Sequence, residues 1–248
     1  MLAALWQRVK NLFSSRAENG RLDVDAVEEI RGIIAGNNKK ISGATLLEKV
    51  RFAVMDLETT GFAYGNGDEI IAVGAVLVEG GKVRPEKYFH QLVYPYRLVP
   101  GKVVDLTGIG RERLVGCPTF FGILPQFLEF LGNSVIVGHC IDFDLGFINA
   151  KLKQHCQVKI KNRSLDTSLL ARALHPALGD YSLDSLLVFY GLEPAGRHTA
   201  LGDALLTAEL FVNLLASLKE QKVFTLNELD SFLRRSKQLA REEAVFIQ

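Results

Sequence analysis

Two acidic residues stand one position apart in the stretch VMDLETTG at 54–61. Asp56 and Glu58 follow apolar residues typical of a buried strand, and side chains at positions i and i+2 of a strand project from the same face. Two carboxylates held side by side repel each other, so the arrangement favours a cation between them. Oxygen donors suit magnesium or manganese better than zinc. For this stretch alone, a solvent-facing strand end is the alternative interpretation.

Acidic residues recur in two later stretches. Asp142 and Asp144 lie in VGHCIDFDLGFINAKL at 137–152, just after a short apolar strand and at the start of a helix, where acids also serve as N-terminal caps. Asp203 lies in RHTALGDALLTAELF at 197–211, on the first turns of a helix with an apolar stripe. An acid on an inward-leaning helical turn is costly unless something pairs with it. We therefore expect acids from three distant segments to converge on one site.

The three motifs DLETTG, HCIDFDLGF and HTALGDA resemble, in order and separation, those of the DEDDh family of 3′-to-5′ exonucleases, typified by the proofreading epsilon subunit of bacterial DNA polymerase III. The likeness covers about residues 50–218 and includes DEIIAVGAV at 68–76, LDTSLLAR at 165–172 and YSLDSLL at 181–187. It implies an α/β fold of the ribonuclease H type, with a mixed five-stranded sheet flanked by helices. It also implies removal of nucleotides from DNA 3′ ends.

The resemblance assigns a role to each residue that matches a family motif. Asp56, Glu58, Asp144 and Asp203 match the four metal-binding carboxylates, and His198, five residues before Asp203, matches the histidine of the subclass. The implied mechanism is hydrolysis of a phosphodiester with two divalent ions, Mg²⁺ or Mn²⁺. His198 is the candidate general base, because an imidazole with an ordinary pKa of about 6.5 accepts a proton near neutral pH.

The turn after the first motif is the expected contact with substrate. The family uses this turn at the terminal nucleotide, which implies binding by Thr59, Thr60 and Gly61. Phe62 follows and is suited to stacking on a terminal base, although simple packing is the alternative. One position departs from the family pattern: Cys140 stands where an Asn is usual, and a thiol cannot reproduce the donors and acceptor of an amide.

The remaining acids and histidines near the motifs have simpler interpretations. Asp142 and Asp166 are expected to face solvent or to cap helices. Four further histidines lack a comparable context and are expected to be structural or exposed: His90, His139, His155 and His175.

Apolar segments in the first half of the chain predict strands. They lie at 52–56, 70–78 and 87–95, and the turn-forming sequences GNGD at 65–68 and EGGK at 79–82 separate them. This spacing predicts an antiparallel meander.

In the second half, predicted strands alternate with helices. Strands are expected at 134–138 and 163–165. Helices are expected at 119–131, 145–153, 167–173, 182–190 and 201–218. Such alternation implies parallel pairing beside the meander, and so a mixed sheet flanked by helices.

The domain organisation is predicted as a central domain with two appendages. Residues 1–45 form a helical N-terminal extension, 46–220 the exonuclease domain and 221–248 a helical C-terminal tail. Amphipathic patterns at 2–13 and 226–240 either dock a partner such as a DNA polymerase subunit or pack back on the domain.

The bulk composition narrows the setting. The chain has 248 residues and a formal net charge of +1, which gives no global attraction for a long polyanion and fits an enzyme that holds a few nucleotides at a strand end. The three cysteines form no CxxC pair, so a reducing cytoplasm is the expected location. No signal peptide is recognised, and no membrane partner is expected.

Two other functions are compatible with the motifs. A ribonuclease that trims RNA 3′ ends would use the same metal chemistry, so the motifs do not decide between DNA and RNA; single-stranded DNA is the preferred expectation. A polymerase-associated interaction subunit is the other alternative. A module without catalysis would be expected to lose an acid or His198, and none is lost.

Overall fold

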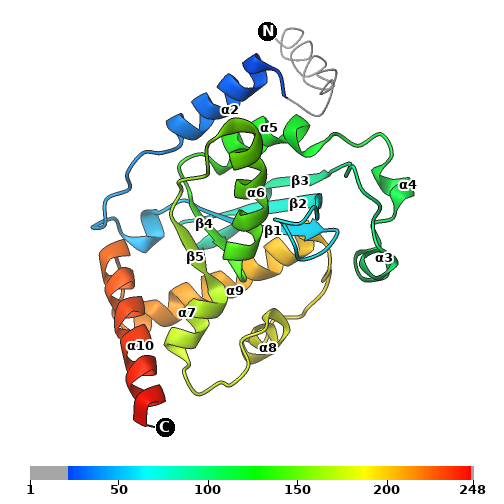
Figure 1. Cartoon of the computed structure of the whole chain (residues 1–248). Helices are drawn as coiled ribbons and strands as arrows, with labels where there is room; N and C mark the ends of the chain where they lie inside the picture. Colours follow the sequence, from blue (N-terminus) through cyan, green and yellow to red (C-terminus); the bar gives the residue numbers. More distant parts are fainter. Residues whose placement is uncertain (1–21, 247–248) are drawn as a thin grey trace.

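The computed structural model describes residues 22–246, so the helix expected at 2–13 lies outside the described part. A five-stranded sheet in the order β3-β2-β1-β4-β5 forms its centre (Figure 1). The strands are β1 (Phe52–Thr59), β2 (Ile70–Glu79), β3 (Lys82–Leu92), β4 (Val135–Gly138) and β5 (Ser164–Asp166). The first three pair antiparallel, whereas β1 with β4 and β4 with β5 pair parallel. The predicted mixed sheet is confirmed.

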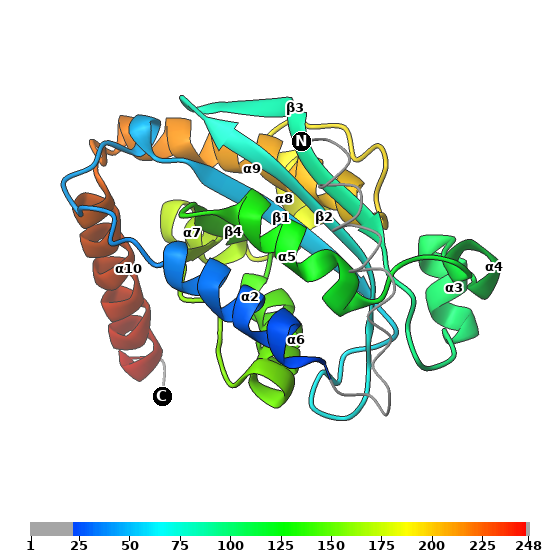
Figure 2. The ribbon, with the colours of Figure 1, turned by 90° about the horizontal axis from the view of Figure 1, so that it is seen from above.

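Helices cover both faces of this sheet. They are α2 (Val24–Gly36), the short 3₁₀ helix η2 (Leu47–Lys49), α3 (Gly101–Thr107), α4 (Arg111–Leu114), α5 (Phe120–Leu131), α6 (Ile141–Cys156), α7 (Thr167–Leu174), α8 (Leu183–Phe189), α9 (Ala200–Glu220) and α10 (Leu226–Phe246). Figures 1 and 2 show α2, α5 and α6 on one face and α9 on the other, with α3 and α4 projecting past one end of the sheet.

Four elements differ from the expectations. The helices α3 and α4 were not predicted, because seven and four residues are too few to establish an apolar period. Strand β3 starts and ends earlier than the predicted 87–95, since it is an edge strand with mostly exposed or half-buried side chains and no clear alternation. Helix α6 begins at Ile141, one turn before the predicted start at 145.

The two faces of β1 serve two different apolar cores. Phe52 and Val54 pack in the core on the α9 side. Ala53, Met55 and Leu57 pack in the core covered by α5 and α6. This alternation is the period of two that a strand imposes when both of its faces are covered.

The alternation determines where the acids of β1 point. Asp56 and Glu58 continue the row of Phe52 and Val54, so they project to the side of α9. Asp203 lies in the first turn of α9. The apolar pattern of one strand therefore directs its two acids at the helix that carries a third.

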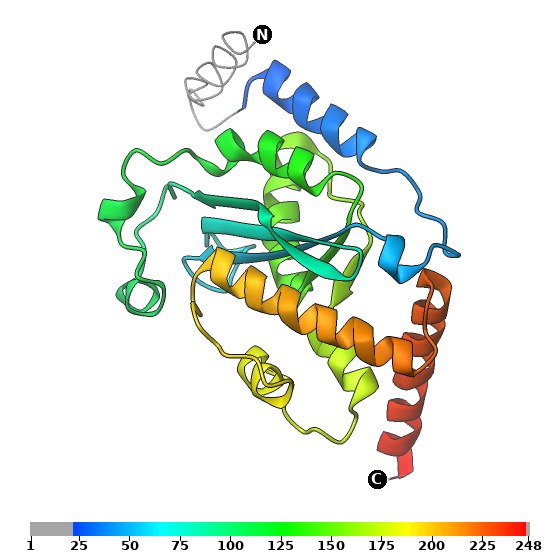
Figure 3. The ribbon, with the colours of Figure 1, turned by 180° about the vertical axis from the view of Figure 1, so that it is seen from behind.

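Helix α9 is the central support of that face. Its residues pack across β1, β2 and β3, as Figure 3 shows from behind. By length and composition it is also the one helix among residues 22–246 that passes a test for a membrane span, with half of the tested window buried. Its contacts with the sheet identify it as a core helix of this domain.

The segments that flank the central domain pack against it. In α2, Ile30 is buried and Arg31 donates from Nε to the Cys156 carbonyl at 2.9 Å. At the other end, Leu229 of α10 is buried and Asp230 forms an ion pair with Arg163. For α10, the structure therefore agrees with the expectation that this segment packs back on the domain.

A glycine allows α9 to approach the sheet. Gly74 pairs with Asp56 across β1 and β2, and a Cβ on Gly74 would lie 2.2 Å from the carbonyl carbon and oxygen of Ala200. Both of these atoms are backbone atoms of the first turn of α9. The glycine therefore fixes the distance between the acids of β1 and the acid of α9.

We expect Gly74→Ala to lower the free energy of unfolding by about 1–3 kcal/mol, because the new methyl group must displace helix backbone. Gly65→Ala is the matched control, since a Cβ there meets nothing within 4 Å. Chemical denaturation of both variants measures the difference. Equal stability of the two variants would contradict close packing at Gly74.

Candidate active site

Three carboxylates meet at the end of β1. Ligand oxygens of Asp56, Glu58 and Asp203 all lie within 4.8 Å of one another. Asp203 is 6% exposed and the other two are half-buried. Three anions at this separation, with oxygen as the donor atom, fit a hard divalent cation such as Mg²⁺ or Mn²⁺. The structure thus brings together three of the four acids expected to bind metal.

The fourth acid reaches the same strand end from the opposite face of the sheet. Asp144 lies in the first turn of α6 and is 4% exposed. Its Oδ1 accepts a hydrogen bond of 3.0 Å from the Leu57 backbone N–H. Because Leu57 stands between Asp56 and Glu58, this bond holds Asp144 against the segment that carries the first two acids.

Asp166 keeps α6 in place. Its Oδ2 accepts from the Ile141 N–H at 3.0 Å, at the start of α6, and its Oδ1 accepts from the Ser168 N–H at 2.8 Å, at the start of α7. One carboxylate therefore caps two helices, which confirms the capping role expected from sequence. Asp142 is exposed, as expected for a solvent-facing residue outside the acidic cluster.

Cys140 stands in an unfavourable backbone conformation. Its φ of 59° and ψ of 42° are left-handed, and its side chain makes no capping hydrogen bond to α6. Asn and Gly tolerate this conformation better than other residues do. The departure from the family pattern therefore has a backbone consequence in addition to the loss of an amide.

His198 lies beside the acids in a loop, and its backbone is strained. Its φ is 62°, and its backbone N–H donates to Asp203 Oδ2 at 3.2 Å. The next residue, Thr199, caps α9 by accepting from the Gly202 N–H at 3.2 Å. The half-buried His198 ring makes no hydrogen bond to another residue of the described part. Its backbone is thus anchored to a predicted metal ligand, while its imidazole has no hydrogen-bond partner among residues 22–246.

Arg197 is a site residue that the sequence did not single out. Its Nη1 forms an ion pair with Asp203, and its Nε donates to Asp184 Oδ1 at 2.7 Å. The guanidinium is only 19% exposed, so it offsets part of the negative charge of the cluster. The available signal was a cation next to His198, but the spacing along the chain gives no indication that it pairs with both Asp184 and Asp203.

The turn after β1 is held by side-chain hydrogen bonds. Thr60 is 2% exposed, and its hydroxyl donates to Asp68 Oδ1 and accepts from the Glu69 N–H, both at 3.0 Å. Thr59 Oγ1 donates to the Gly61 carbonyl at 2.7 Å. The Thr60 hydroxyl is therefore engaged in shaping the turn, and its place in substrate binding stays a prediction together with those of Thr59 and Gly61.

Phe62 lies at the outer end of this turn. Its side chain is 88% exposed, and its ring lies 5.8 Å from the ring of Phe143 at a tilt of 53°. An aromatic ring with one partner and an open face suits stacking on a base. Packing accounts for little of its surface.

The other histidines have structural partners or face solvent. His139 Nδ1 lies 3.0 Å from Thr167 Oγ1, and His175 Nε2 lies 2.7 Å from the Tyr190 hydroxyl. His155 contacts the ring of Phe121, and His90 is exposed on β3. The expectation for these four residues is confirmed.

The crowding of the acids changes their proton affinity. Burial, followed by the charge of Asp203, raises the pKa of Glu58 to about 7. Burial raises the pKa of Asp144 to about 8, against the hydrogen bond from Leu57. Burial and the charges of Asp144, Asp203 and Glu58 raise the pKa of Asp56 well above its usual range. The site therefore retains protons near neutral pH that a divalent cation would displace.

Comparison with known proteins identifies the family. A family described as "Exonuclease" matches residues 53–211. The DNA polymerase III subunit epsilon of Aquifex aeolicus is 45% identical over 167 residues, which cover 67% of this chain and 81% of that protein. The chain belongs to the exonuclease family. The predicted family and its activity, a 3′-to-5′ exonuclease that hydrolyses phosphodiesters, are thereby confirmed.

The chain is also similar to a larger DNA polymerase and to solved structures of other exonucleases. A DNA polymerase III PolC-type from Caldanaerobacter subterraneus is 36% identical over 182 residues, but these cover only 13% of that protein. Among solved structures, the nuclease domain of 3′hExo, a DEDDh family member bound to rAMP, has a TM-score of 0.61 at 18% identity and covers 69% of this chain and 94% of its own. Exonuclease X in complex with 5′ overhanging duplex DNA has a TM-score of 0.58 at 23% identity and covers 74% and 99%. These structures support the predicted fold.

The raised pKa values predict a pH-dependent stability without metal. Between the ordinary acid pKa of about 4 and the raised values of about 7 and 8, the folded state binds more protons than the unfolded state, so stability falls as pH rises. We expect the free energy of unfolding of the chelated exonuclease to fall by about 5 kcal/mol from pH 5.5 to 8.5 through these two groups. Denaturation at several pH values measures the slope.

The Glu58→Gln, Asp144→Asn double variant is the control, because it keeps the shape of both side chains and replaces both titrating carboxyl groups by amides. Its slope should be shallower than that of the wild type. Saturating Mg²⁺ should stabilise the wild type more at pH 8.5 than at pH 5.5, because ligation needs ionised carboxylates. If the free energy of unfolding changed equally with pH in the two proteins, the raised pKa values of Glu58 and Asp144 would be contradicted.

The left-handed backbone at position 140 gives a separate prediction. Cys140→Asn should stabilise the exonuclease by about 0.5–1 kcal/mol, because Asn tolerates this conformation. Cys117→Asn, at a half-buried cysteine outside the left-handed region, is the control and should bring no gain. Thermal unfolding compares them. A loss of stability in Cys140→Asn would contradict the explanation.

Proposed function

We propose that this exonuclease removes nucleotides from DNA 3′ ends with two divalent ions, Mg²⁺ or Mn²⁺, held by Asp56, Glu58, Asp144 and Asp203. The observation that carries the proposal is the convergence of ligand oxygens from β1 and α9 within 4.8 Å, with Asp144 hydrogen-bonded to the residue between the first two acids. When bound, such ions activate water and stabilise charge on a scissile phosphate. The four carboxylates act as the ligands that hold them.

His198 is the proposed general base. Its imidazole has no hydrogen-bond partner among the described residues and its backbone is bonded to Asp203, so the ring is available to take a proton from the attacking water. The bond from its backbone N–H to Asp203 limits how far the loop moves from the site. His198 therefore takes up the proton, while the acids hold the ions that would stabilise charge on the scissile phosphate.

The turn at 59–62 is the proposed site of the terminal nucleotide. Thr60 supports it from inside, Thr59 and Gly61 present backbone to the substrate, and the open face of Phe62 stacks on the terminal base. Stacking requires an unpaired base, which favours a single-stranded or frayed DNA end.

A DNA polymerase is the proposed partner, since the relative that is 45% identical carries the name DNA polymerase III subunit epsilon. Proofreading or repair would follow from that association. The cytoplasm is the proposed location, in agreement with three cysteines that are all free. We also propose 46–220 as the exonuclease domain, with 1–45 and 221–248 as appendages; the family match at 53–211 lies within the central part.

The test is digestion of 5′-labelled single-stranded DNA, of a primer with a mismatched end and of RNA of the same sequence, in Mg²⁺. The wild type should shorten DNA from its 3′ end, and Asp56→Ala should reduce the rate at least about 100-fold, because a ligand of the metal site is lost. Asp142→Ala removes an exposed acid near Asp144 and should stay within about twofold, since surface charges contribute little.

Equal activity in Asp56→Ala and wild type would refute the site. Faster digestion of RNA than of DNA would replace the proposed substrate by RNA and leave the catalytic assignment in place.

A further inference from the structure

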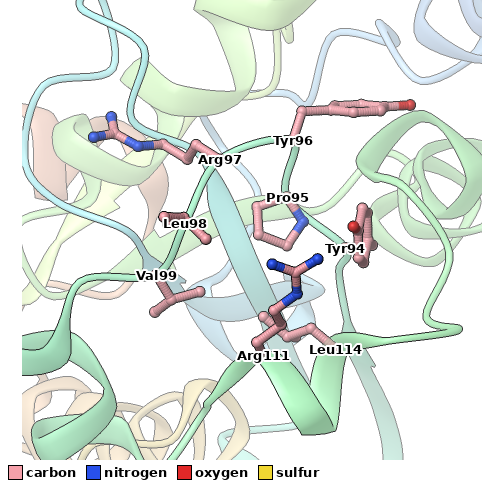
Figure 4. A pocket seen from close by; sticks show the side chains of 8 residues that line it. All are labelled: Tyr94, Pro95, Tyr96, Arg97, Leu98, Val99, Arg111 and Leu114. Atoms are coloured by element: carbon pink, nitrogen blue, oxygen red, sulfur yellow. The ribbon is translucent and has the colours of Figure 1, made fainter.

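A small cavity lies beside the active-site turn, where the chain leaves β3. Its volume is about 150 Å³. Figure 4 shows the eight residues that line it, which we call the tyrosine-arginine pocket: Tyr94, Pro95, Tyr96, Arg97, Leu98, Val99, Arg111 and Leu114. They come from the segment between β3 and α3 and from α4. None of them has a role in the site described above.

The pocket carries a positive charge, that of Arg111, which has no ion-pair partner in the described part of the chain. Arg111 is exposed, and its guanidinium forms no hydrogen bond or ion pair with any residue of 22–246. Figure 4 shows its guanidinium between the side chains of Pro95 and Tyr94. Arg97 points away from it and pairs with Asp68 at 2.7 Å. None of the eight lining residues has a carboxylate, so the Arg111 guanidinium is available to an anion, and its planar donors match the oxygens of a phosphate.

The same pocket presents aromatic surface to solvent. The rings of Tyr94 and Tyr96 lie edge to face with centroids 6.4 Å apart. Tyr96 is 75% exposed, and the neighbouring Leu98 is 73% exposed. Aromatic faces next to an unpaired guanidinium form the combination with which proteins bind single-stranded nucleic acid, because bases stack on the rings while the cation holds the backbone.

Hydrogen bonds connect the pocket to the active-site turn. Arg97 and Thr60 share one oxygen, Asp68 Oδ1. The Tyr96 backbone N–H donates to the Glu69 carboxylate, one residue further along. Hydrogen bonds to two adjacent residues, Asp68 and Glu69, therefore hold the pocket and the turn together.

The position of the pocket fits the path of a strand. Thr59 on β1 pairs with Ile70 on β2, and the Val93 N–H donates to the neighbouring Ile71 carbonyl at 2.9 Å. The start of the pocket at Tyr94 thus lies about two strand spacings, roughly 10 Å, from the end of β1. This separation is short enough for a strand whose terminal nucleotide lies at the turn to reach the pocket with its next few nucleotides.

We propose that the tyrosine-arginine pocket binds unpaired nucleotides of the digested strand, upstream of its terminal nucleotide. Arg111 holds a backbone phosphate and Tyr96 stacks on a base. Neither contact involves the sugar. The pocket therefore favours single strands over duplexes and does not distinguish DNA from RNA. This inference rests on the proposed function of the neighbouring acids, because it gives the pocket a strand whose end they hydrolyse.

The experiment compares two substrates in Mg²⁺: a single-stranded DNA oligonucleotide and the 5′ p-nitrophenyl ester of dTMP, which offers one nucleotide and no upstream strand. Arg111→Gln and Tyr96→Ala should each lower kcat/KM for the oligonucleotide about tenfold, mainly through KM. Both should stay within about twofold of the wild type on the ester, because the pocket does not touch the reacting nucleotide. Arg111→Lys should recover part of the loss.

The controls are Lys102→Gln, which removes an exposed cation of α3 outside the pocket, and Tyr88→Ala, which removes an exposed tyrosine of β3. Both should behave as the wild type on both substrates. In binding measurements with single-stranded DNA in the Asp56→Ala background, Arg111→Gln should reduce the salt slope of log K by about 0.7, the value for one lost phosphate contact.

The two proposals fail in different ways. The pocket would be overturned if its variants lost activity equally on the oligonucleotide and the ester and the salt slope did not change. It would also be overturned if the Lys102→Gln and Tyr88→Ala controls lost as much activity as the pocket variants and the salt slope did not change. Retained hydrolysis in Asp56→Ala would overturn the catalytic site instead. The salt slope of binding would still test whether Arg111 contacts a phosphate.

Discussion

Mutual repulsion among four carboxylates is the constraint that the structure has to satisfy. The acids come from three elements, β1, α6 and α9, and their charges meet at one strand end. Such a cluster is stable only if the elements that carry it are fixed by other interactions. The apolar cores on both faces of β1 provide this: one packs α9 against the sheet and the other packs α5 and α6.

The protein offsets the repulsion unevenly. Asp144 accepts a bond from the Leu57 N–H, and Asp203 accepts one from the His198 N–H and pairs with Arg197. The carboxylates of Asp56 and Glu58 accept no hydrogen bond from residues 22–246, and burial raises the pKa of both. The acids of the helices are therefore held in place by hydrogen bonds or an ion pair within the protein, whereas the carboxylates of β1 are positioned by their strand alone.

Local periodicity explains which parts of this arrangement the sequence predicts. The i, i+2 spacing of Asp56 and Glu58 and the position of Asp203 in the first turn of an amphipathic helix follow from strand and helix geometry, so the sequence identifies them. The pairing of Arg197 with Asp184 does not follow from any local period, because the partners come from different elements. The order of the motifs, which resembles that of a family, supplies the convergence that periodicity alone does not give.

The same argument accounts for the elements that differ from expectation. Strand β3 lies at the edge of the sheet, where half of the periodic signal is missing, and α3 and α4 are shorter than the window in which a helical period is recognised. Cys140 is left-handed because α6 starts at a sharp turn, a feature that a cysteine does not signal. These failures lie in segments whose conformation is set by their neighbours.

The proposed catalytic groups and the proposed substrate contacts thus lie in parts of the fold that are held in place by different interactions. The acids are mounted on a strand and two helices that both cores hold, so their separation is insensitive to surface changes. The turn at 59–62 and the tyrosine-arginine pocket lie in connecting segments, where exposed side chains such as Phe62 and Tyr96 vary at little cost to stability. Asp68 joins these two surfaces through Thr60 and Arg97, so the proposed contacts with a strand are held in a fixed relation to each other.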